Sequence, residues 1–228
     1  MVTRSAAAST HTVHVASRPV VTTVTAHRGV ARRWVRATMW RFAARLRPAA
    51  AGLTVGLGVQ WTPPPRALPG GAPPAAATLQ LCAGGRCLVF QLARAGGAVP
   101  ALLRRFLADA RVTFAGYNVA ADRRRLRAHH GLEVASAMEL RRESGMGRAS
   151  LGEMAAALVG LRMAAKPAAV VRSDWGAAKL SKKQVRYACV DAYLSCRLGV
   201  HLRAGDDDSD DDDCGSSQVS DDDDSGSD

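Results

Sequence analysis

The stretch from Leu53 to Trp61 has Gly58 and Gln60 near its end, at positions where metal ligands are common, yet neither residue has a side chain that binds metal ions well. The stretch is apolar and rich in β-branched residues, and three prolines follow soon after it, which predicts a buried strand. Side chains alternate along a strand, so Gly58 and Gln60 share one face near its end, where α/β folds place chemistry. Two carboxylates at these positions would form a metal site, whereas a glycine and a neutral amide do not.

Three other residues have the types and spacing of a reactive site. Tyr187 and Asp191 lie four residues apart in a segment expected to form a helix over 181–202, so they share one helix face. Asp122 lies in a helix expected over 119–129, directly after a short strand and turn. A tyrosine and an aspartate at this spacing are common by chance, so the pair carries little weight alone.

Hydrophobic periodicity and turn residues predict the elements that would position these side chains. The expected strands span 12–15, 20–25, 53–61, 77–82, 86–92, 112–115 and 134–140, and the expected helices span 30–46, 99–110, 119–129, 150–159 and 181–202. Apart from an N-terminal hairpin and helix, the order is a three-strand meander followed by alternating units. It predicts an α/β domain with a mixed five-stranded sheet and helices on both faces, which is the order of the ribonuclease-H-like fold.

Composition divides the chain into four parts. We expect disorder over 1–10, an N-terminal hairpin and helix of the domain over 11–50, the main domain over 51–204, and an acidic disordered tail over 205–228. An arginine-rich start without acidic residues is also typical of an organellar transit peptide, but Trp34 and Trp40 favour a packed helix. No run approaches the roughly 18 apolar residues of a membrane span, and no signal-peptide core is evident.

The net charge of +11 hides a strong segregation. Twelve of the 20 acidic residues are aspartates after position 205, which leaves eight in the body against all 31 basic residues, a balance of +23. No acidic residue precedes Asp109. Such a body attracts polyanions, nucleic acid first, although compositional drift towards alanine, arginine, glycine and proline also explains part of the bias.

The five cysteines are odd in number and form no CxxC pair. We therefore expect free thiols in a reducing compartment. Cys82 and Cys87 flank a tight turn, but a zinc site needs four ligands and there is no second pair.

Several segments together resemble the DEDDy 3'–5' exonucleases. Tyr187-Ala-Cys-Val-Asp191 is similar to their third motif, and Gly116-Tyr-Asn-Val-Ala-Ala-Asp122 is similar to their second. The meander strands and the Ser173-Asp-Trp175 context resemble the Werner-syndrome-type exonucleases, especially the plant branch. The resemblance covers about residues 12–203.

This resemblance implies a site with four carboxylates that hold two divalent ions, Mg²⁺ or Mn²⁺. Asp122 and Asp191 would be metal ligands, and Tyr187 would position the attacking water. The family's first motif, Asp-x-Glu, aligns with Gly58 and Gln60, so the formal charge of the ligands falls from four negatives to two. We expect metal to bind weakly at best and catalysis to fall by orders of magnitude.

The resemblance also bears on neighbouring residues. Glu139 lies where the family often has an acidic residue, and its simpler interpretation is a surface charge or helix-cap partner. A basic run on the helix after Asp122 is a candidate nucleic-acid contact, or else a solvated face: Arg123, Arg124, Arg125 and Arg127.

Three hypotheses for the function follow. The first is an exonuclease-like protein that binds DNA or RNA but is catalytically impaired. The second is an active metal-dependent 3'–5' exonuclease that releases nucleotides from DNA or RNA 3' ends. The third is a non-catalytic protein-interaction module. The acidic tail would either compete with nucleic acid for the basic body or only aid solubility. The expected compartment is the nucleus or cytoplasm, with an organelle left open, and the oligomeric state is not predicted.

Overall fold

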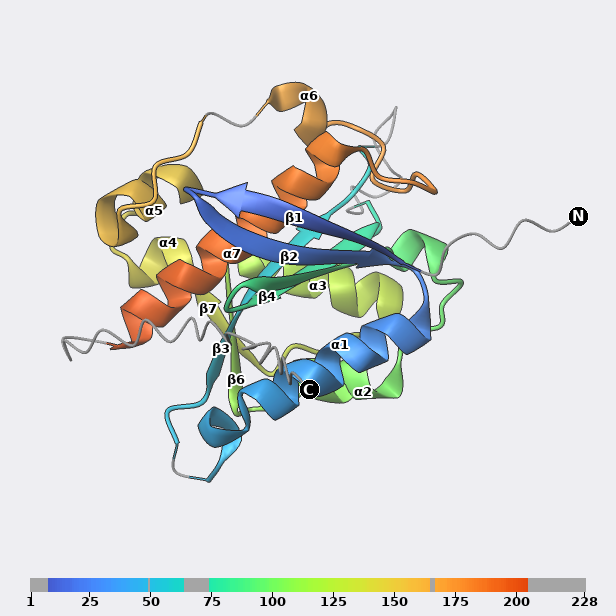
Figure 1. The fold of residues 1–228 in the computed structure, drawn as a ribbon, viewed down its shortest axis with the longest axis horizontal. Coiled ribbons are helices and arrows are strands. Elements are labelled where there is room, and N and C mark those ends of the chain that lie inside the picture. The colour runs from blue at the N-terminus through green and yellow to red at the C-terminus, as the bar shows by residue number, and fades with distance from the viewer. Residues whose placement is uncertain (1–7, 49, 64–73, 165–166, 205–228) are drawn as a thin grey trace, which may run out of the picture.

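The protein, described by a computed structural model over residues 8–48, 50–63, 74–164 and 167–204, is built on one seven-stranded mixed sheet (Figure 1). The strands lie in the order β1-β2-β5-β4-β3-β6-β7. Their bounds are Ser9–Val15 (β1), Arg18–Thr25 (β2), Leu53–Gln60 (β3), Thr78–Ala83 (β4), Arg86–Phe90 (β5), Val112–Gly116 (β6) and Ser136–Glu139 (β7). β3 pairs antiparallel with β4 and parallel with β6, so it joins the meander to the alternating half of the fold.

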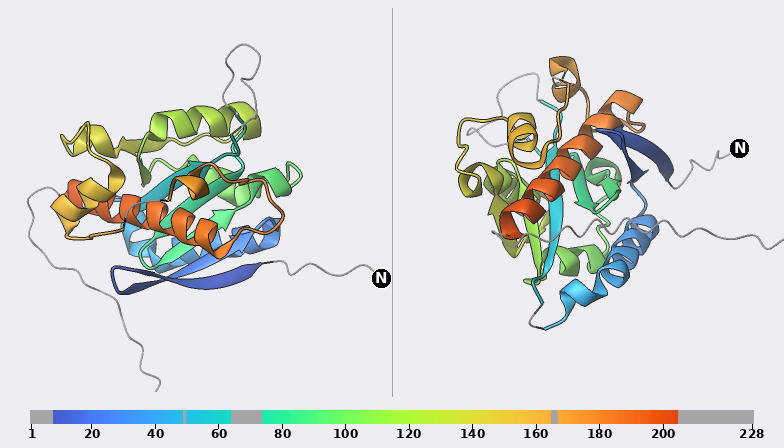
Figure 2. Two further views of the ribbon diagram at one scale, coloured as in Figure 1. Left: turned by 90° about the horizontal axis from the view of Figure 1, so that it is seen from above. Right: turned by 60° about the vertical axis from the view of Figure 1, so that its left-hand side comes forward.

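Helices cover both faces of this sheet (Figures 1 and 2). The long helix α7 and helix α5 share one core with the sheet, and α1, α2 and α3 share the core on the other face. Their bounds are Lys182–Ala204 (α7), Leu151–Val159 (α5), Arg28–Arg41 (α1), Ala101–Leu107 (α2) and Val119–His130 (α3). Four short elements complete the described fold: η1 (Ala43–Leu46), η3 (Leu92–Arg94), α4 (Leu140–Glu143) and α6 (Ala168–Val171). Within the described ranges, no helix is both long and apolar enough to span a membrane.

The side chains of β3 divide between the two cores. Its odd-numbered residues, from Leu53 to Val59, are buried in the core beneath α1, α2 and α3. The alternate residues face α7. At Gly56 the two backbones come so close that a Cβ atom would overlap the carbonyl oxygen of Ala192 and lie 2.6 Å from the amide nitrogen of Cys196. β3 therefore presents its even-numbered positions directly to α7.

Two helices on the α7 face begin with reciprocal caps, close to the starts expected at residues 150 and 181. Ser150 accepts from the amide of Glu153, whose carboxylate accepts from the amide of Ser150, and these two bonds form a capping box at the start of α5. Ser181 and Gln184 make the same pair of bonds at the start of α7. These bonds satisfy amides that the first turn leaves without partners, so they fix where each helix begins.

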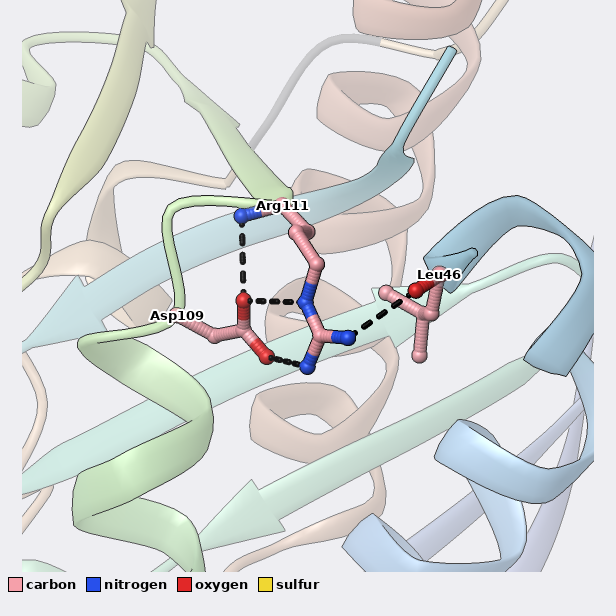
Figure 3. A network of polar contacts seen from close by, with 3 residues as sticks. All are labelled: Leu46, Asp109 and Arg111. Carbon is pink, nitrogen blue, oxygen red and sulfur yellow. Dashed lines mark hydrogen bonds and ion pairs between the residues drawn. The ribbon is translucent and has the colours of Figure 1, made fainter. Parts of the chain in front are cut away.

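A charged contact ties the segment after α1 to the start of β6 (Figure 3). Arg111 donates to both carboxylate oxygens of Asp109, at 2.9 and 2.7 Å, and to the carbonyl oxygen of Leu46, at 2.9 Å. The hydrogen bonds from Arg111 lower the pKa of Asp109. This contact links η1 to the loop that leads into the sheet.

The predicted elements are present with shifted bounds, and the strand count is corrected. The predicted helix over 30–46 is two pieces, α1 and η1. The predicted five-stranded sheet has seven strands because β2 pairs in parallel with β5, which brings the β1–β2 hairpin into the same sheet. Local periodicity does not show a pairing between residues so far apart in sequence. Ser9 and Thr10 belong to β1, so the prediction of disorder over 1–10 is wrong for them. Residues 1–7 and the acidic tail lie outside the described residues.

The prediction of free thiols is wrong for one pair. Cys82 and Cys87 form a disulfide across the β4–β5 hairpin. They are direct partners in the strand register, with Cα atoms 4.2 Å apart, so the turn between them brings the sulfurs together. Cys189 and Cys196 are buried free thiols on α7, and Cys214 lies outside the described residues.

Candidate active site

The residues that the sequence singles out come from three elements that meet at the end of β3. Gly58 and Gln60 lie on the face of β3 that faces α7. Tyr187 and Asp191 lie on α7 itself, one turn apart. Asp122 lies in the first turn of α3, and its carboxylate accepts a hydrogen bond from the backbone N–H of Val59, between the two β3 positions. The fold thus brings together side chains that are more than 60 residues apart in sequence.

Asp122 is held in a nearly dry environment. Only 6% of its surface is exposed, and this burial raises the pKa of its carboxyl to about 8. The nearby Arg125, whose guanidinium lies 3.9 Å from Asp122 Oδ1, and the Val59 amide oppose the rise, whereas the charges of Glu139 and Asp191 add to it. A buried aspartate without a metal ion therefore holds its proton near neutral pH.

The substitution Asp122→Asn should stabilise the metal-free protein at pH 8 and change little near pH 4. In the unfolded chain the Asp122 carboxyl loses its proton near its ordinary pKa of 3.8, whereas in the folded chain it keeps the proton up to about pH 8. The folded state therefore binds more protons in this window, and wild-type stability falls as pH rises through it. Asparagine resembles the protonated acid and has no charge to bury. Because each pKa unit corresponds to about 1.4 kcal/mol, the gain at pH 8 should be a few kcal/mol.

Urea unfolding with chelator present, at several pH values between 4 and 8, measures this difference. Asp109→Asn is the control of opposite sign, because Arg111 lowers the pKa of Asp109. That variant should lose stability at pH 8. An equal gain for Asp122→Asn at both ends of the range would mean that packing, and not buried charge, explains it.

Tyr187 and Asp191 form a linked pair on α7. The Tyr187 hydroxyl shares a hydrogen bond with the Asp191 carboxylate, and burial together with this negative neighbour raises the pKa of the phenol. The ring of Tyr187 packs against Trp175, with centroids 5.8 Å apart. Trp175 is fully buried. The tyrosine is thus a neutral donor held in a fixed position beside a carboxylate.

A pocket of about 250 Å³ opens beside this pair. Tyr187 and Asp191 line it together with Lys183 and Arg186, and Met163 and Val170 are among its apolar lining residues. Arg186 also donates to the carbonyl oxygen of His14 on β1. The pocket combines a hydroxyl, a carboxylate, two cations and an apolar wall.

Gly58 leaves a space that Gln80 of β4 partly fills. The two residues are partners in the strand register, and a Cβ atom at Gly58 would lie 3.0 Å from Gln80 Oε1. Gln80 is fully buried; its amide nitrogen donates to Thr78 Oγ1 at 2.5 Å, and Oε1 has no partner among the described residues. An uncharged amide therefore lies where the resemblance places a carboxylate.

The residues present do not fit a two-metal centre. Within the described residues no group of three or more histidine, cysteine, aspartate or glutamate side chains is arranged to hold a metal ion. Asp122 and Asp191 are in place, but Gly58 offers no ligand and Gln60 offers a neutral oxygen at most. A cation of the chain itself, Arg125, lies 3.9 Å from Asp122 Oδ1.

The basic run after Asp122 does not act as one exposed face. Arg125 turns inward, with its side chain 15% exposed and its guanidinium 3.9 Å above the ring of Trp61. Arg127 pairs with Glu133 at 2.9 Å on the surface. Arg123 and Arg124 are exposed. The expectation that all four arginines lie on an exposed helix face is therefore wrong for Arg125, because Trp61 and Asp122 hold it.

The carboxylates of Glu139 and Asp174 accept hydrogen bonds from nearby backbone amides, and for Glu139 this is the cap role that the sequence allows. The carboxylate of Glu139 accepts from the backbone N–H of Asn118, the residue just before α3, at 3.0 Å. Asp174 accepts from Thr62 and from the amide of Gly176, both at 2.9 Å, so it caps a loop. Within the described residues, neither carboxylate belongs to a group of three or more candidate metal ligands.

Sequence reasoning missed three features of the site. Gln80 is an amide in a strand whose other residues, apart from Thr78, are apolar, and that was a readable signal. Lys183 and Arg186 follow the Ser181 cap, where helix periodicity would have placed them near Tyr187. The pairing of Arg125 with Trp61 had no local signal, because the two residues come from different elements.

Comparisons with known proteins agree with this geometry. The family model described as 3'-5' exonuclease matches residues 72–204, a range that contains Asp122, Tyr187 and Asp191 and begins after β3. A search of curated proteins finds no significant match.

Solved structures show the same fold at low identity. NrnC of Brucella melitensis is 21% identical, with 65% of this chain and 71% of that chain covered and a TM-score of 0.54. The catalytic core of RRP6 from Trypanosoma brucei is 10% identical, and the match covers 84% of this chain and 48% of that chain with a TM-score of 0.63. Trypanosoma brucei RNase D in complex with RNA U12 is 14% identical, and the match covers 76% of this chain and 61% of that chain with a TM-score of 0.58. This chain spans less than two thirds of the latter two chains.

Proposed function

This chain belongs to the 3'-5' exonuclease family, and from this premise we propose that it binds nucleic acid on an exonuclease fold whose hydrolytic site is impaired. The observation that carries the proposal is the meeting of Tyr187, Asp191 and Asp122 with a β3 strand that presents Gly58 and Gln60. Within the family we infer a likeness to the Werner-type branch, from the two motifs that end in Asp122 and Asp191 and from the meander strands over 77–82 and 86–92.

The charges around the site support binding. The pocket beside Tyr187 and Asp191 offers Lys183 and Arg186 to a phosphate and an apolar wall to a base or sugar. The body of the chain carries a large excess of basic residues, which favours association with any polyanion. The related fold of Trypanosoma brucei RNase D was solved with RNA, so RNA is a partner to test beside DNA.

The ligand set argues against efficient hydrolysis. Two divalent ions carry four positive charges, and the family mechanism uses four carboxylates to hold them. Asp122 and Asp191 supply two, and Asp122 favours its protonated form near neutral pH without a metal ion. Weak metal binding should lower the rate of phosphodiester cleavage by orders of magnitude.

One experiment separates the three hypotheses for the wild-type chain. Labelled 3'-recessed DNA and single-stranded RNA are incubated with the protein in Mg²⁺, in Mn²⁺ or in chelator, and both binding and mononucleotide release are followed. We expect binding that persists in chelator and weakens steeply with salt, with no release in either metal.

Two other outcomes would each support one of the remaining hypotheses. Metal-dependent release of mononucleotides that Asp191→Asn abolishes would show an active exonuclease. A folded protein that binds neither substrate at low salt would leave only the protein-interaction module.

A further inference from the structure

A second pocket lies on the face of the sheet opposite α7, between helix α1 and the strands β2 and β5. Its volume is about 220 Å³. Residues from α1 and the two strands line it: Thr23, Val30, Arg33, Trp34, Ala37 and Arg86. None of these residues belongs to the site at the end of β3.

The polar groups of this pocket are hydrogen-bond donors that have no anionic partner. Among the residues described, no ion pair involves Arg33 or Arg86, and no acidic residue precedes Asp109 anywhere in the chain. Trp34 is 4% exposed, and its indole N–H finds no acceptor in the described part of the chain. A buried donor without an acceptor is costly. Two guanidinium groups, an indole N–H and a hydroxyl favour an anionic oxygen ligand such as a phosphodiester.

The outer face of α1 continues this surface. Trp40 is 82% exposed, which is unusual for so large an apolar side chain. The other exposed residues within α1 are arginines: Arg28, Arg32, Arg33, Arg36 and Arg41. From Arg33 to Trp40 the helix makes two turns, about 10 Å along its axis. One helix face thus offers phosphate-binding guanidinium groups and, beyond them, a flat aromatic ring.

We propose that this α1 surface, defined by the pocket at Arg33, Trp34 and Arg86 together with the outer residues Arg36 and Trp40, binds single-stranded nucleic acid. The inference rests on the proposed nucleic-acid binding and adds a second site to it. A backbone phosphate occupies the pocket, and an unpaired base stacks on Trp40. Stacking on an aromatic ring beside cationic side chains is how proteins hold single strands without reading sequence.

Features of this surface favour a single strand over other polyanions. A duplex keeps its bases stacked inside, so its backbone would use the arginines and leave Trp40 without a partner. A membrane-binding helix needs a broad apolar face beside its basic one, whereas Trp40 is the exposed large apolar residue of α1 within the described chain. An acidic peptide would pair with the arginines alone.

The surface also differs in function from the pocket beside Tyr187. An exonuclease site accepts a 3' end, but the α1 surface contacts the backbone and one base, so it needs no end. A closed circular single strand should therefore bind to the α1 surface as well as a linear one does. In this arrangement the α1 surface binds an internal part of the strand, independently of whether the 3' end is bound in the pocket beside Tyr187.

The test measures the affinity of the full chain for labelled single strands of about 12 nucleotides, within the site size that such proteins cover. Linear and circular forms are compared in chelator over a salt series. Trp40→Ala should weaken binding of both forms about tenfold, the size of one lost base stack. Arg33→Gln with Arg36→Gln should weaken binding and lower the slope of log affinity against log salt by about 1.4, for two phosphate contacts.

The matched control removes the same charge elsewhere. Arg94→Gln with Arg148→Gln changes two exposed arginines outside α1 and should leave the affinity within about twofold. Circular dichroism confirms that each variant is folded, which is expected because Arg33, Arg36 and Trp40 are all exposed.

Three results would overturn the inference. If the α1 variants bind like wild type while wild type binds tightly, the second site does not exist and the proposed function stands. If the control pair weakens binding as much as the α1 pair, only net charge matters. If wild type binds no strand at low salt, the proposed function fails as well.

Discussion

The combined substitution Gly58→Asp and Gln60→Glu should make the chain a metal-dependent nuclease. We expect it to release mononucleotides from a 3'-recessed DNA in Mg²⁺ or Mn²⁺ at least about two orders of magnitude faster than wild type. The two new carboxylates lie on the β3 face that packs against α7, the helix of Asp191, and beside the Val59 amide that donates to Asp122. They raise the formal ligand charge from two negatives to four, which offsets the charge of two divalent ions.

The structure has room for the new side chain at position 58. Its Cβ atom would lie 3.0 Å from Gln80 Oε1, and this neighbour is the far end of a flexible side chain. Rotation of the amide would turn Nε2 towards the new carboxylate and Oε1 towards the Thr78 hydroxyl. Both amide atoms would then have partners, whereas Oε1 has none among the described residues now. The flexible amide of Gln80 can therefore accommodate an aspartate at position 58 and donate a hydrogen bond to it.

Single variants and a knock-out test the interpretation. Each single substitution should remain close to wild type, because three carboxylates still leave one metal position incomplete. Asp191→Asn in the double variant should abolish the new activity. A folded double variant that binds Mn²⁺ no more tightly than wild type, and releases nothing, would show that Gly58 and Gln60 are not the limiting defect. The nuclease assay and a Mn²⁺ titration measure the two quantities.

The sequence predicted the parts of this site that depend on local pattern. The period of β3 placed Gly58 and Gln60 on one face, and the spacing of Tyr187 and Asp191 placed them on one side of α7. The helices expected to begin at residues 150 and 181 begin at Leu151 and Lys182. Each of these inferences used residues within a few positions of one another, where backbone geometry alone fixes the outcome.

The features that the sequence did not predict depend on contacts between distant segments. β2 joins the sheet through β5, about 65 residues later. Arg125 leaves the solvent because Trp61 of another segment offers it a ring. Cys82 and Cys87 pair because the register of the hairpin aligns them, and a one-residue shift would separate them.

Gly56→Ala should destabilise the protein by about 3 kcal/mol or more. Position 56 is where β3 and α7 pack backbone against backbone. The added methyl group would overlap the carbonyl oxygen of Ala192 and crowd the amide of Cys196. These neighbours are backbone atoms in the middle of a long helix, so no side-chain rotation relieves the overlap. The helix would have to move away from the sheet, and Tyr187 and Asp191 would move with it.

Gly152→Ala is the matched control for this prediction. It also adds one methyl group, but at a helical position of α5 with no atom within 4 Å of the new Cβ. Alanine there should be neutral or stabilise the helix by up to about 1 kcal/mol. Urea unfolding followed by circular dichroism measures both variants. A loss of less than about 1 kcal/mol for Gly56→Ala would mean that α7 can shift on β3 at little cost. The placement of α7, and with it Asp191, on β3 would then not be fixed by backbone packing, and the gain of activity expected from the double variant would lose its structural basis.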